Sequence, residues 1–415
     1  MIYNIVIYFV LWGIAIASLF NEKVRKMWRG EREAFKILKQ KVDPHAKYVW
    51  FHAASLGEFE QGRPLMERIR KDYPQYKILL TFYSPSGYEV RKNYEGADII
   101  CYMPVDTRLN AIRFLRLVRP VMAFFIKYEF WSNFLHILAH RGIPTYSVSS
   151  IFRPDQVFFK WYGKGYAGVL KCFTRFFVQN EESKHLLESI GITDVDVVGD
   201  TRFDRVLQIK EAAKQLPICE AFRQGSSTSS EDGYKVFVAG SSWPPDEEIF
   251  IRFFNEHKNW RLLIAPHVIG EDHLKFILSL IKNKKVVRYT QTSPEEAAEA
   301  DVLIIDCFGL LSSMYHYGDV AYVGGGFGVG IHNTLEAAVW NMPVIFGPNN
   351  KKFQEAQGLL KSKGGFEINN FEEFENLMKR LMDDASFLKS SGEKAGAFVA
   401  SLSGATDKVL SKVKF

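Results

Sequence analysis

Two successive series of short apolar runs, each run followed by an amphipathic segment, constrain the fold of this chain more than any other feature. The first series comprises residues 48–51, 77–83, 97–104, 121–126, 144–150 and 175–180; the second comprises 235–241, 261–267, 285–290, 301–306, 319–325 and 342–347. Segments with helical spacing, such as 63–73 and 110–118, lie between the runs. Strands that alternate with helices form parallel sheets whose faces are covered by helices. The sequence therefore predicts two doubly wound α/β domains in tandem, with a cleft between them.

The length of the chain supports this division, because 415 residues exceed what one compact core usually holds. A polar stretch rich in Gly and Ser, GSSTSSEDG at 225–233, indicates a surface loop near the domain junction. We therefore predict a first domain over residues 22–210, a linker over 211–234 and a second domain over 235–415.

The N-terminal residues 2–20 carry no charged side chain and are followed by five Lys and Arg residues between positions 23 and 32. A helix of this length rises roughly 28 Å, close to the ~30 Å thickness of a membrane's hydrocarbon core. No basic segment precedes it, which disfavours a removed signal peptide. We predict a membrane anchor over residues 1–21, with the body on the cytoplasmic side because the basic flank follows the helix. A buried core helix is the alternative, and a helix lying in the membrane interface is left open.

Composition and isolated residues argue against several other classes of protein. A net charge of +6 is too modest to imply nucleic acid, and the aromatic, basic segments KYEFW and FFKWYGKGY fit a membrane interface better. The four cysteines lack CxxC spacing, which argues against a disulfide framework or a zinc site. His52 and His267 have no companion ligand at metal spacing, so we interpret them as structural and predict no metal site.

A glycine-rich segment, GGGFGVGIHNTLEAA at 324–338, follows a predicted strand and precedes a predicted helix that begins near His332 or Asn333. Backbone without side chains can approach a ligand closely, and a helix N-terminus favours a phosphate. Glu336, three residues after Asn333, would accept hydrogen bonds from ribose hydroxyls. A plain tight turn is the alternative interpretation. The Gly-Lys-Ser/Thr of a P-loop is absent, so NTP hydrolysis is not predicted.

Three charged residues follow predicted strands of the first domain: Glu58, Glu129 and Arg202. Glu58 lies near a helix N-terminus, where the dipole favours an ionised carboxylate that can accept a proton. Arg202 could hold an anionic donor or stabilise departing negative charge. The alternatives are that both acids merely favour first helical turns, and that Arg202 pairs with Asp200 or Asp204.

Together, HAASLGE, KYEFW, VVGDTRFD, AGSS, GGGFGVGIHNTLEAA and PVIFGP resemble motifs of the 3-deoxy-D-manno-octulosonic acid (Kdo) transferases of Gram-negative bacteria. These are GT-B glycosyltransferases of lipopolysaccharide synthesis, and the likeness spans nearly the whole chain. It implies a GT-B fold and inverting transfer of Kdo from CMP-Kdo to a lipid A precursor at the cytoplasmic face of the inner membrane. It also implies no metal and no separate cofactor, because a nucleoside monophosphate donor has no pyrophosphate that needs Mg²⁺.

The resemblance also implies roles for individual residues. Glu58 matches the family's catalytic base and Glu129 its second acid, and Arg202 stands where the family usually has Lys. The residues expected at the CMP donor are Ser241, Pro266, His267, Phe308, Gly309, Leu310, Gly325, Gly326, Asn333, Thr334, Leu335 and Glu336.

This sequence departs from the family's pattern at three places. It has Pro266-His267-Val268 where Pro-Arg-His is common, Gly309-Leu310-Leu311 where Gly-Glu-Leu is common, and SSIFRP instead of an Asn-Ala-Arg pattern. These differences predict altered contacts to the donor rather than a different reaction.

Two other functions are open at this point. One is a GT-B transferase or epimerase that uses a UDP-sugar, which predicts binding of UDP rather than CMP. The other is a catalytically silent nucleotide-binding module on the membrane, which would bind CMP and be indifferent to Glu58→Ala. The fold alone does not discriminate among them.

Overall fold

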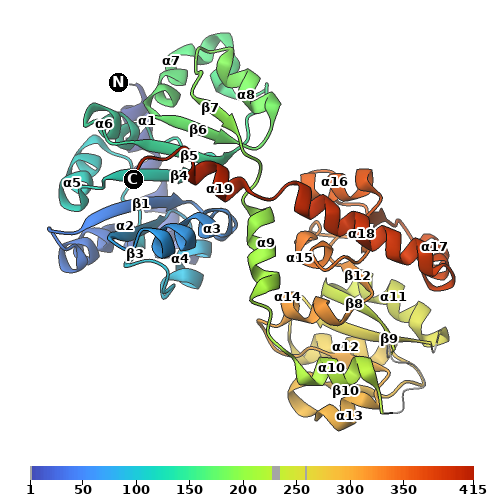
Figure 1. The fold of residues 1–415 in the computed structure, drawn as a ribbon. Helices are drawn as coiled ribbons and strands as arrows, with labels where there is room; N and C mark the ends of the chain where they lie inside the picture. The colour runs from blue at the N-terminus through green and yellow to red at the C-terminus, as the bar shows by residue number, and fades with distance from the viewer. Residues whose placement is uncertain (1, 227–233, 258) are drawn as a thin grey trace. The chain divides into compact units, whose positions relative to one another are not determined.

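The computed structural model describes residues 2–226, 234–257 and 259–415. It divides into two compact units, Met1–Arg205 with Ser403–Phe415 and Val206–Leu402 (Figure 1). Each unit contains one seven-stranded sheet in which every paired strand runs parallel to its neighbour. The predicted fold class, two doubly wound α/β domains, is confirmed.

The first sheet has the strand order β3-β2-β1-β4-β5-β6-β7. Its strands are β1 (Lys47–Ala53), β2 (Tyr76–Phe82), β3 (Ile99–Tyr102), β4 (Met122–Ile126), β5 (Thr145–Ser150), β6 (Arg175–Val178) and β7 (Val195–Val197). The chain starts in the middle at β1, adds β2 and β3 on one side, and then adds β4 to β7 on the other. The carboxyl ends of β1 and β4 therefore form the topological switch point, where doubly wound sheets bind their ligands.

Helices cover both faces of this sheet (Figure 1). Apart from α1 (Ile2–Phe20), which packs on α2, the helices of this unit are α2 (Glu22–Lys41), α3 (Leu56–Asp72), α4 (Pro85–Arg91), α5 (Arg108–Val118), α6 (Ser132–His140), α7 (Lys164–Ala167), α8 (Glu181–Glu188) and α19 (Ala405–Leu410). Alternate side chains of β1 point to opposite faces: Trp50 packs with α2, α5 and α6 residues, whereas Phe51 packs with α3 and α19 residues. Burial on both faces explains why this strand reads as a continuous apolar run.

The second sheet has the order β10-β11-β9-β8-β12-β13-β14. Its strands are β8 (Lys235–Ser242), β9 (Trp260–Pro266), β10 (Val286–Arg288), β11 (Val302–Ile304), β12 (Val320–Val323), β13 (Val344–Phe346) and β14 (Gly365–Glu367). The switch point here lies between β8 and β12. The short edge strand β14 was not predicted, because three residues carry too little pattern to separate them from a loop.

The helices of the second unit alternate with these strands. They are α10 (Pro217–Gln224), α11 (Pro244–Glu256), α12 (Glu271–Leu280), α13 (Pro294–Ala298), α14 (Leu311–Met314), α15 (Leu335–Ala338), α16 (Gln354–Ser362), α17 (Phe371–Asp383) and α18 (Ala385–Ser401). α9 (Arg202–Glu211) contains the boundary between the units. Of the predicted loop at 225–233, residues 227–233 lie outside the described residues.

The C-terminal residues differ from the sequence-based division, which placed them in the second domain. Ser403–Phe415 belongs to the first unit, where Ala405 and Val409 of α19 are fully buried against the α3 face of the sheet. The Asp204 carboxylate accepts hydrogen bonds from the backbone N–H groups of Gly404 (2.5 Å) and Thr406 (2.7 Å) at the start of this helix. Contacts between residues 200 positions apart leave no local signal in the sequence.

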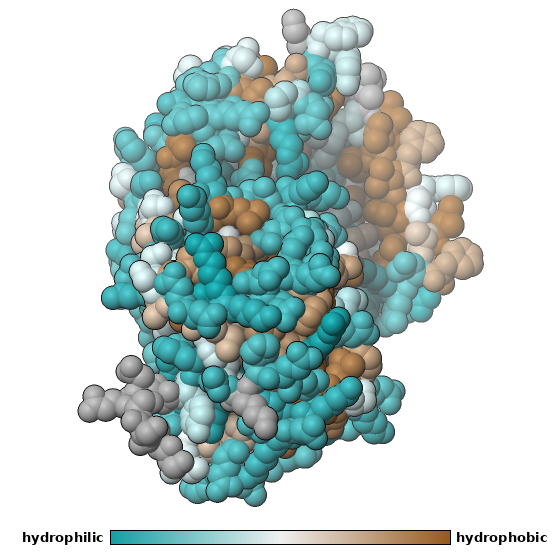
Figure 2. Space-filling view, turned by 90° about the vertical axis from the view of Figure 1, so that its right-hand side faces the viewer, coloured by the Kyte–Doolittle hydropathy of each residue, from teal (hydrophilic) through white to brown (hydrophobic). Residues whose placement is uncertain are grey.

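The N-terminal helix α1 is long and apolar enough to cross a membrane, by length and composition. Only 6% of its stretch Tyr3–Phe20 is buried. The alternative of a buried core helix is therefore wrong. Figure 2 shows a hydrophobic band at the right of the upper part, where α1 lies after the turn from Figure 1. The first turn of α1 is attached to the first unit, since the Tyr3 hydroxyl donates to Asp106 (2.5 Å) and Asn133 donates to the Asn4 side-chain oxygen (2.8 Å).

Candidate functional site

Glu58 lies in the first turn of α3, directly after β1. Its Oε2 accepts a hydrogen bond from the backbone N–H of Ala54 (2.5 Å). Burial, and then the charge of Glu129, raise the pKa of Glu58 to about 6, against the smaller lowering effects of the Ala54 N–H, His52 and Lys127. The helix dipole was expected to favour the ionised form, but burial outweighs it. The resulting carboxylate is still largely ionised at neutral pH and is a stronger base than an ordinary one.

Glu129 follows β4, the neighbour of β1, and a chain of buried polar groups positions its carboxylate. Its Oε2 accepts from the Trp131 indole N–H (2.6 Å) and lies 3.2 Å from His52 Nε2. His52 Nδ1 lies 2.9 Å from Thr81 Oγ1. With a proton on Nε2, His52 can donate to the Glu129 carboxylate while its Nδ1 accepts from the Thr81 hydroxyl. Through these contacts His52 orients the Glu129 carboxylate.

Lys127 forms the turn between β4 and Glu129. Its φ of 67° is in the left-handed region, which residues with a side chain seldom adopt. The turn is held by its backbone N–H, which donates to Val148 O in the neighbouring strand (2.9 Å). Strained backbone of this kind clusters at functional sites. Lys127 was not predicted as a site residue, yet its positive charge lowers the pKa of Glu58.

Arg202, the first residue of α9, forms an ion pair with Asp200, which was one of the two alternatives for it. The guanidinium Nε donates to Asp200 Oδ2 (2.8 Å), and Asp200 also accepts from the Gln61 side chain of α3 (3.1 Å). The Thr201 hydroxyl donates to Gln61 O (2.5 Å). These bonds draw the segment after the edge strand β7 towards α3.

Tyr128 shows that these charges lie near one another. Burial raises the pKa of its hydroxyl; Glu58 and Asp200 raise it too, whereas Arg153 and Arg202 lower it. The structure thus brings the three predicted residues of the first domain to the same edge of one sheet, two of them at its switch point.

In the second unit, the predicted donor residues lie at or after the carboxyl ends of β8, β9, β11 and β12, which are adjacent in the sheet. Ser241 at the end of β8 has a left-handed φ of 50°, beside a register shift between β8 and β9. Phe308, after β11, has an exposed side chain (80%), and Gly309 beside it has a φ of 85°. An exposed aromatic ring at this edge offers a stacking surface for a base.

A stack of three rings lies beside Ser241. The His267 ring stacks on Trp243 (centroids 4.8 Å apart) and on His332 (4.3 Å). The Trp243 indole N–H donates to His332 Nε2 (3.1 Å). Burial and then the charge of His267 lower the pKa of His332 to about 4, so it is neutral at physiological pH. Trp243 and His332 were not predicted as site residues, because nothing local indicates that residues 89 apart share a hydrogen bond.

The glycine-rich loop is needed for close packing of the backbone. A Cβ at Gly324 would lie 2.3 Å from Ser241 O, and one at Gly326 would lie 2.5 Å from Gly347 N. Gly325 and Gly330 have φ values of 92° and 106°. Close packing of the backbone is thus enough to explain why several of these positions are glycine. This is what the alternative of a plain tight turn predicts.

The segment after this loop differs from the prediction in one respect. The helix expected to start near His332 or Asn333 is the four-residue α15, which begins at Leu335 after Thr334. It is too short to provide the predicted phosphate site. Asn333 Nδ2 donates to Glu336 Oε1 (2.9 Å) and so orients the carboxylate. The Thr334 hydroxyl oxygen is buried and has no hydrogen-bond partner among the described residues.

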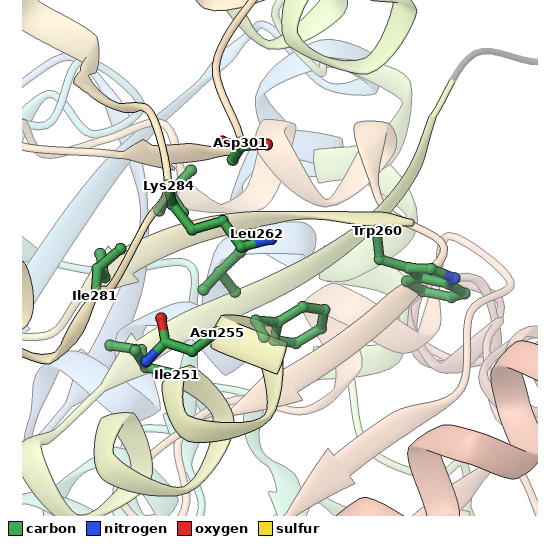
Figure 3. Close-up of a pocket in the computed structure, with 9 residues that line it drawn as sticks. Ile251, Asn255, Trp260, Leu262, Ile281, Lys284 and Asp301 are labelled. Atoms are coloured by element: carbon green, nitrogen blue, oxygen red, sulfur yellow. The ribbon is translucent and has the colours of Figure 1, made fainter. Parts of the chain in front are cut away.

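Two further features bear on what the second unit can hold. Figure 3 shows a pocket between α11, β9 and β11, into which Asn255, Leu262 and Lys284 extend. Its volume of about 10 Å³ leaves room for about one water molecule at most, and it lies at the amino ends of the strands, so it is no nucleotide site. Among the described residues, no group of three or more His, Cys, Asp or Glu could hold a metal ion, and the four cysteines are free.

Comparison with known proteins gives two kinds of likeness. Residues 29–205 match the family model described as 3-deoxy-D-manno-octulosonic-acid transferase (kdotransferase). The 3-deoxy-D-manno-octulosonic acid transferase of Rickettsia felis is 26% identical over 87% of this chain and 78% of its own length. The enzyme of the same name from Aquifex aeolicus is 26% identical over 85% of this chain and 92% of its own length.

Among solved structures, UDP-GlcNAc 2-epimerase from Neisseria meningitidis bound to UDP-GlcNAc superposes with a TM-score of 0.60. It is 15% identical and covers 88% of this chain and 98% of its own. At this identity the likeness shows a shared GT-B fold and nothing of the substrate. The family model covers the first unit and the relatives cover most of the chain; together they support the 3-deoxy-D-manno-octulosonic acid transferase family for this protein.

Proposed function

We propose that this protein is an inverting glycosyltransferase that moves Kdo from CMP-Kdo to a lipid A precursor. The observation that carries the proposal is the Glu58 carboxylate, with a pKa raised to about 6, at the switch point of the first sheet. A base poised near neutral pH suits removal of a proton from a sugar hydroxyl. The likeness to Kdo transferases supports these donor and acceptor classes.

In this reaction the oxygen of the acceptor hydroxyl attacks the anomeric carbon of Kdo, and Glu58 takes the proton of that hydroxyl. The bond from that carbon to the CMP phosphate breaks, and CMP leaves with the electron pair. Glu129, oriented by His52 and Trp131, makes Glu58 more basic through its charge. We assign Arg202 to stabilisation of developing negative charge in the transition state.

We assign the CMP part of the donor to the second unit. The exposed ring of Phe308 suits stacking on the base, and the Asn333–Glu336 pair suits the ribose hydroxyls. The buried, unpartnered hydroxyl of Thr334 supports a polar ligand in this segment. The donor carries a single phosphate, so the reaction proposed here uses no metal and no separate cofactor.

We place the protein at the cytoplasmic face of the inner membrane. The exposed apolar helix α1 supports membrane association, and the basic residues that follow it support a cytoplasmic body.

The test is to incubate purified protein with freshly generated CMP-Kdo and a tetra-acylated lipid A precursor, and to weigh the lipid by mass spectrometry. A Kdo-sized increment is expected. If none forms and UDP rather than CMP raises the melting temperature, a UDP-sugar enzyme replaces the proposal. If no increment forms while CMP still raises the melting temperature, the protein is a binding module.

The transfer rate is expected to fall on the acid side of an apparent pKa near 6, because only ionised Glu58 accepts a proton. Well below that pH, the rate should drop about tenfold per pH unit. In Glu129→Gln the acid limb should move to lower pH, since the charge of Glu129 raises the pKa of Glu58. Single-turnover rates across pH measure both effects.

The control is Glu182→Gln, which removes the same charge from an exposed position in α8 and should leave the limb in place. An acid limb at an ordinary carboxyl pKa in the wild type, or one unmoved by Glu129→Gln, would contradict the electrostatic coupling of the two acids.

A further inference from the structure

A cavity of about 290 Å³ lies in the first unit between α1, α2 and α5, apart from the residues assigned above. The lining residues that matter here are Leu11, Trp28, Glu31, Arg32, Asn110 and Arg113. They combine an apolar wall from the N-terminal helix, two cations, a carboxyl group and an amide. The proposed reaction gives none of them a role.

Glu31 is the most unusual of these residues, because only 4% of it is exposed and neither carboxyl oxygen has a hydrogen-bond partner in the described chain. Burial raises its pKa to about 8, so the group is neutral at pH 7 and can donate as well as accept. The hydroxyl of Tyr102, within electrostatic range of Glu31, is also buried and unpartnered. Buried polar groups are nearly always satisfied in native proteins, and a polar ligand would satisfy Glu31.

Arg32 and Arg113 supply the positive charge. The Arg32 guanidinium lies over the Trp28 ring (4.4 Å to its centroid) and that of Arg113 over the Phe35 ring (4.2 Å). Among the described residues, neither makes an ion pair with a carboxylate. Guanidinium groups fixed on aromatic rings and lacking a counter-charge suit a phosphate, which they can bind through two parallel hydrogen bonds.

The position of the cavity indicates what kind of molecule carries that phosphate. One wall comes from Leu11 of α1, whose neighbours Tyr8, Phe9 and Trp12 are exposed apolar or aromatic side chains. Tyr83 does not line the cavity but lies within electrostatic range of Glu31: burial raises the pKa of its hydroxyl, and both Glu31 and Glu129 raise it too. The Tyr83 ring packs on Trp131 (4.9 Å), which donates to Glu129. One wall of the cavity thus comes from the apolar helix α1, and Tyr83 and Trp131 connect its Glu31 to Glu129.

We propose that this cavity binds the phosphate-bearing head of the lipid acceptor, with Arg32 and Arg113 on the phosphate and Glu31 and Asn110 on polar groups beside it. The inference rests on the proposed function for the identity of the acceptor. A phosphorylated amphiphile held here would keep its acyl chains along α1 and present its sugar towards Glu129 and Glu58.

The test compares Arg32→Gln/Arg113→Gln with Arg29→Gln/Arg116→Gln. The second pair removes the same charge from exposed positions of the same two helices but does not line the cavity. Transfer is measured at saturating CMP-Kdo while the phosphorylated lipid A precursor is varied in neutral micelles. We expect the double variant Arg32→Gln/Arg113→Gln to raise KM for the lipid about tenfold or more, with kcat and KM for CMP-Kdo little changed. The control pair should match the wild type.

A dephosphorylated precursor completes the test. The wild type should bind the dephosphorylated precursor as weakly as Arg32→Gln/Arg113→Gln binds the phosphorylated one. Removal of the phosphate should not weaken binding to this double variant any further. Equal losses in both pairs, or no loss in the first, would overturn the site. Melting temperatures detect misfolding, and Arg32→Lys/Arg113→Lys, which keeps the charge but not the paired hydrogen bonds, should be intermediate.

Two further measurements are needed. One distinguishes the lipid acceptor from bulk phospholipid as the source of the phosphate, and the other distinguishes failure of the cavity site from failure of the proposed function. If the first pair loses binding to phosphatidylglycerol vesicles while its KM in neutral micelles is unchanged, the cavity holds bulk phospholipid and not the acceptor. Inorganic phosphate alone should not compete at millimolar concentration, because it lacks the apolar part. If the wild type transfers no sugar, the proposed function fails; equilibrium binding of the precursor without donor then still decides whether the cavity holds a phosphorylated lipid.

Discussion

Glu58→Gln is expected to lower the rate of sugar transfer by about 10²–10⁴-fold, the usual contribution of a positioned general base. The amide is the same size as the carboxylate, and its oxygen can still accept the Ala54 N–H at the start of α3. It cannot take a proton from the acceptor. The loss should therefore appear in the single-turnover rate, with the melting temperature and the binding of CMP nearly unchanged.

Glu60→Gln is the matched control for this substitution. Glu60 lies two residues further along α3, is also partly exposed, and pairs most closely with Arg91 (2.7 Å), with Arg205 (3.5 Å) and Arg63 (3.8 Å) further away. Loss of a partly exposed ion pair costs at most about 1 kcal/mol, and transfer should persist. A normal rate in Glu58→Gln would leave the transferase in place and remove Glu58 as its base. A comparable loss in Glu60→Gln would point to a general effect on α3.

Asp246→Ala is expected to destabilise the second unit by about 3 kcal/mol or more, because each buried donor left unpaired costs about 1–3 kcal/mol. The Asp246 side chain is buried and accepts hydrogen bonds from the backbone N–H groups of Trp243 (3.0 Å) and Gly325 (2.9 Å) and from the Tyr322 hydroxyl (2.7 Å). It thereby ties the start of α11 to the glycine-rich loop. Calorimetric unfolding would measure the loss, and CMP protection against unfolding should weaken with it.

Asp246→Asn separates hydrogen bonding from charge. Its side-chain oxygen can keep both backbone donors, while its amide donates to the Tyr322 oxygen, so most of the stability should return. If the alanine variant unfolds at the wild-type temperature, Asp246 does not hold the loop. If the asparagine variant is as unstable as the alanine variant, the negative charge is what stabilises this turn.

Much of the architecture could be predicted from local pattern. The run containing Trp50 and Phe51 is apolar throughout because both faces of β1 are covered. Glu58, Glu129 and Arg202 could be placed after strands because a change from apolar to polar residues marks a strand end. The N-terminal helix could be recognised because nineteen residues without charge leave no polar face.

The candidate site could be predicted only in part. Motif resemblance indicated Glu58 and Glu129, but not that His52, 77 residues from Glu129, orients the second acid. Nor did it indicate that Trp243 and His332 share a hydrogen bond, that α15 has four residues, or that α19 returns to the first sheet. Each of these features depends on which distant segments pack together.

By itself, then, the sequence determined the alternation of strands and helices, the apolar N-terminal helix, and the position of each charged motif at a strand end. These follow from side-chain periodicity and local propensity, which neighbouring residues decide. Only the tertiary structure decided the strand order that makes β1 and β4 neighbours, the burial that raises the pKa of Glu58, and the cavity that leaves Glu31 unpartnered. Those are set by packing between residues far apart in the chain, because burial and electrostatic coupling depend on the surrounding side chains rather than on adjacent ones.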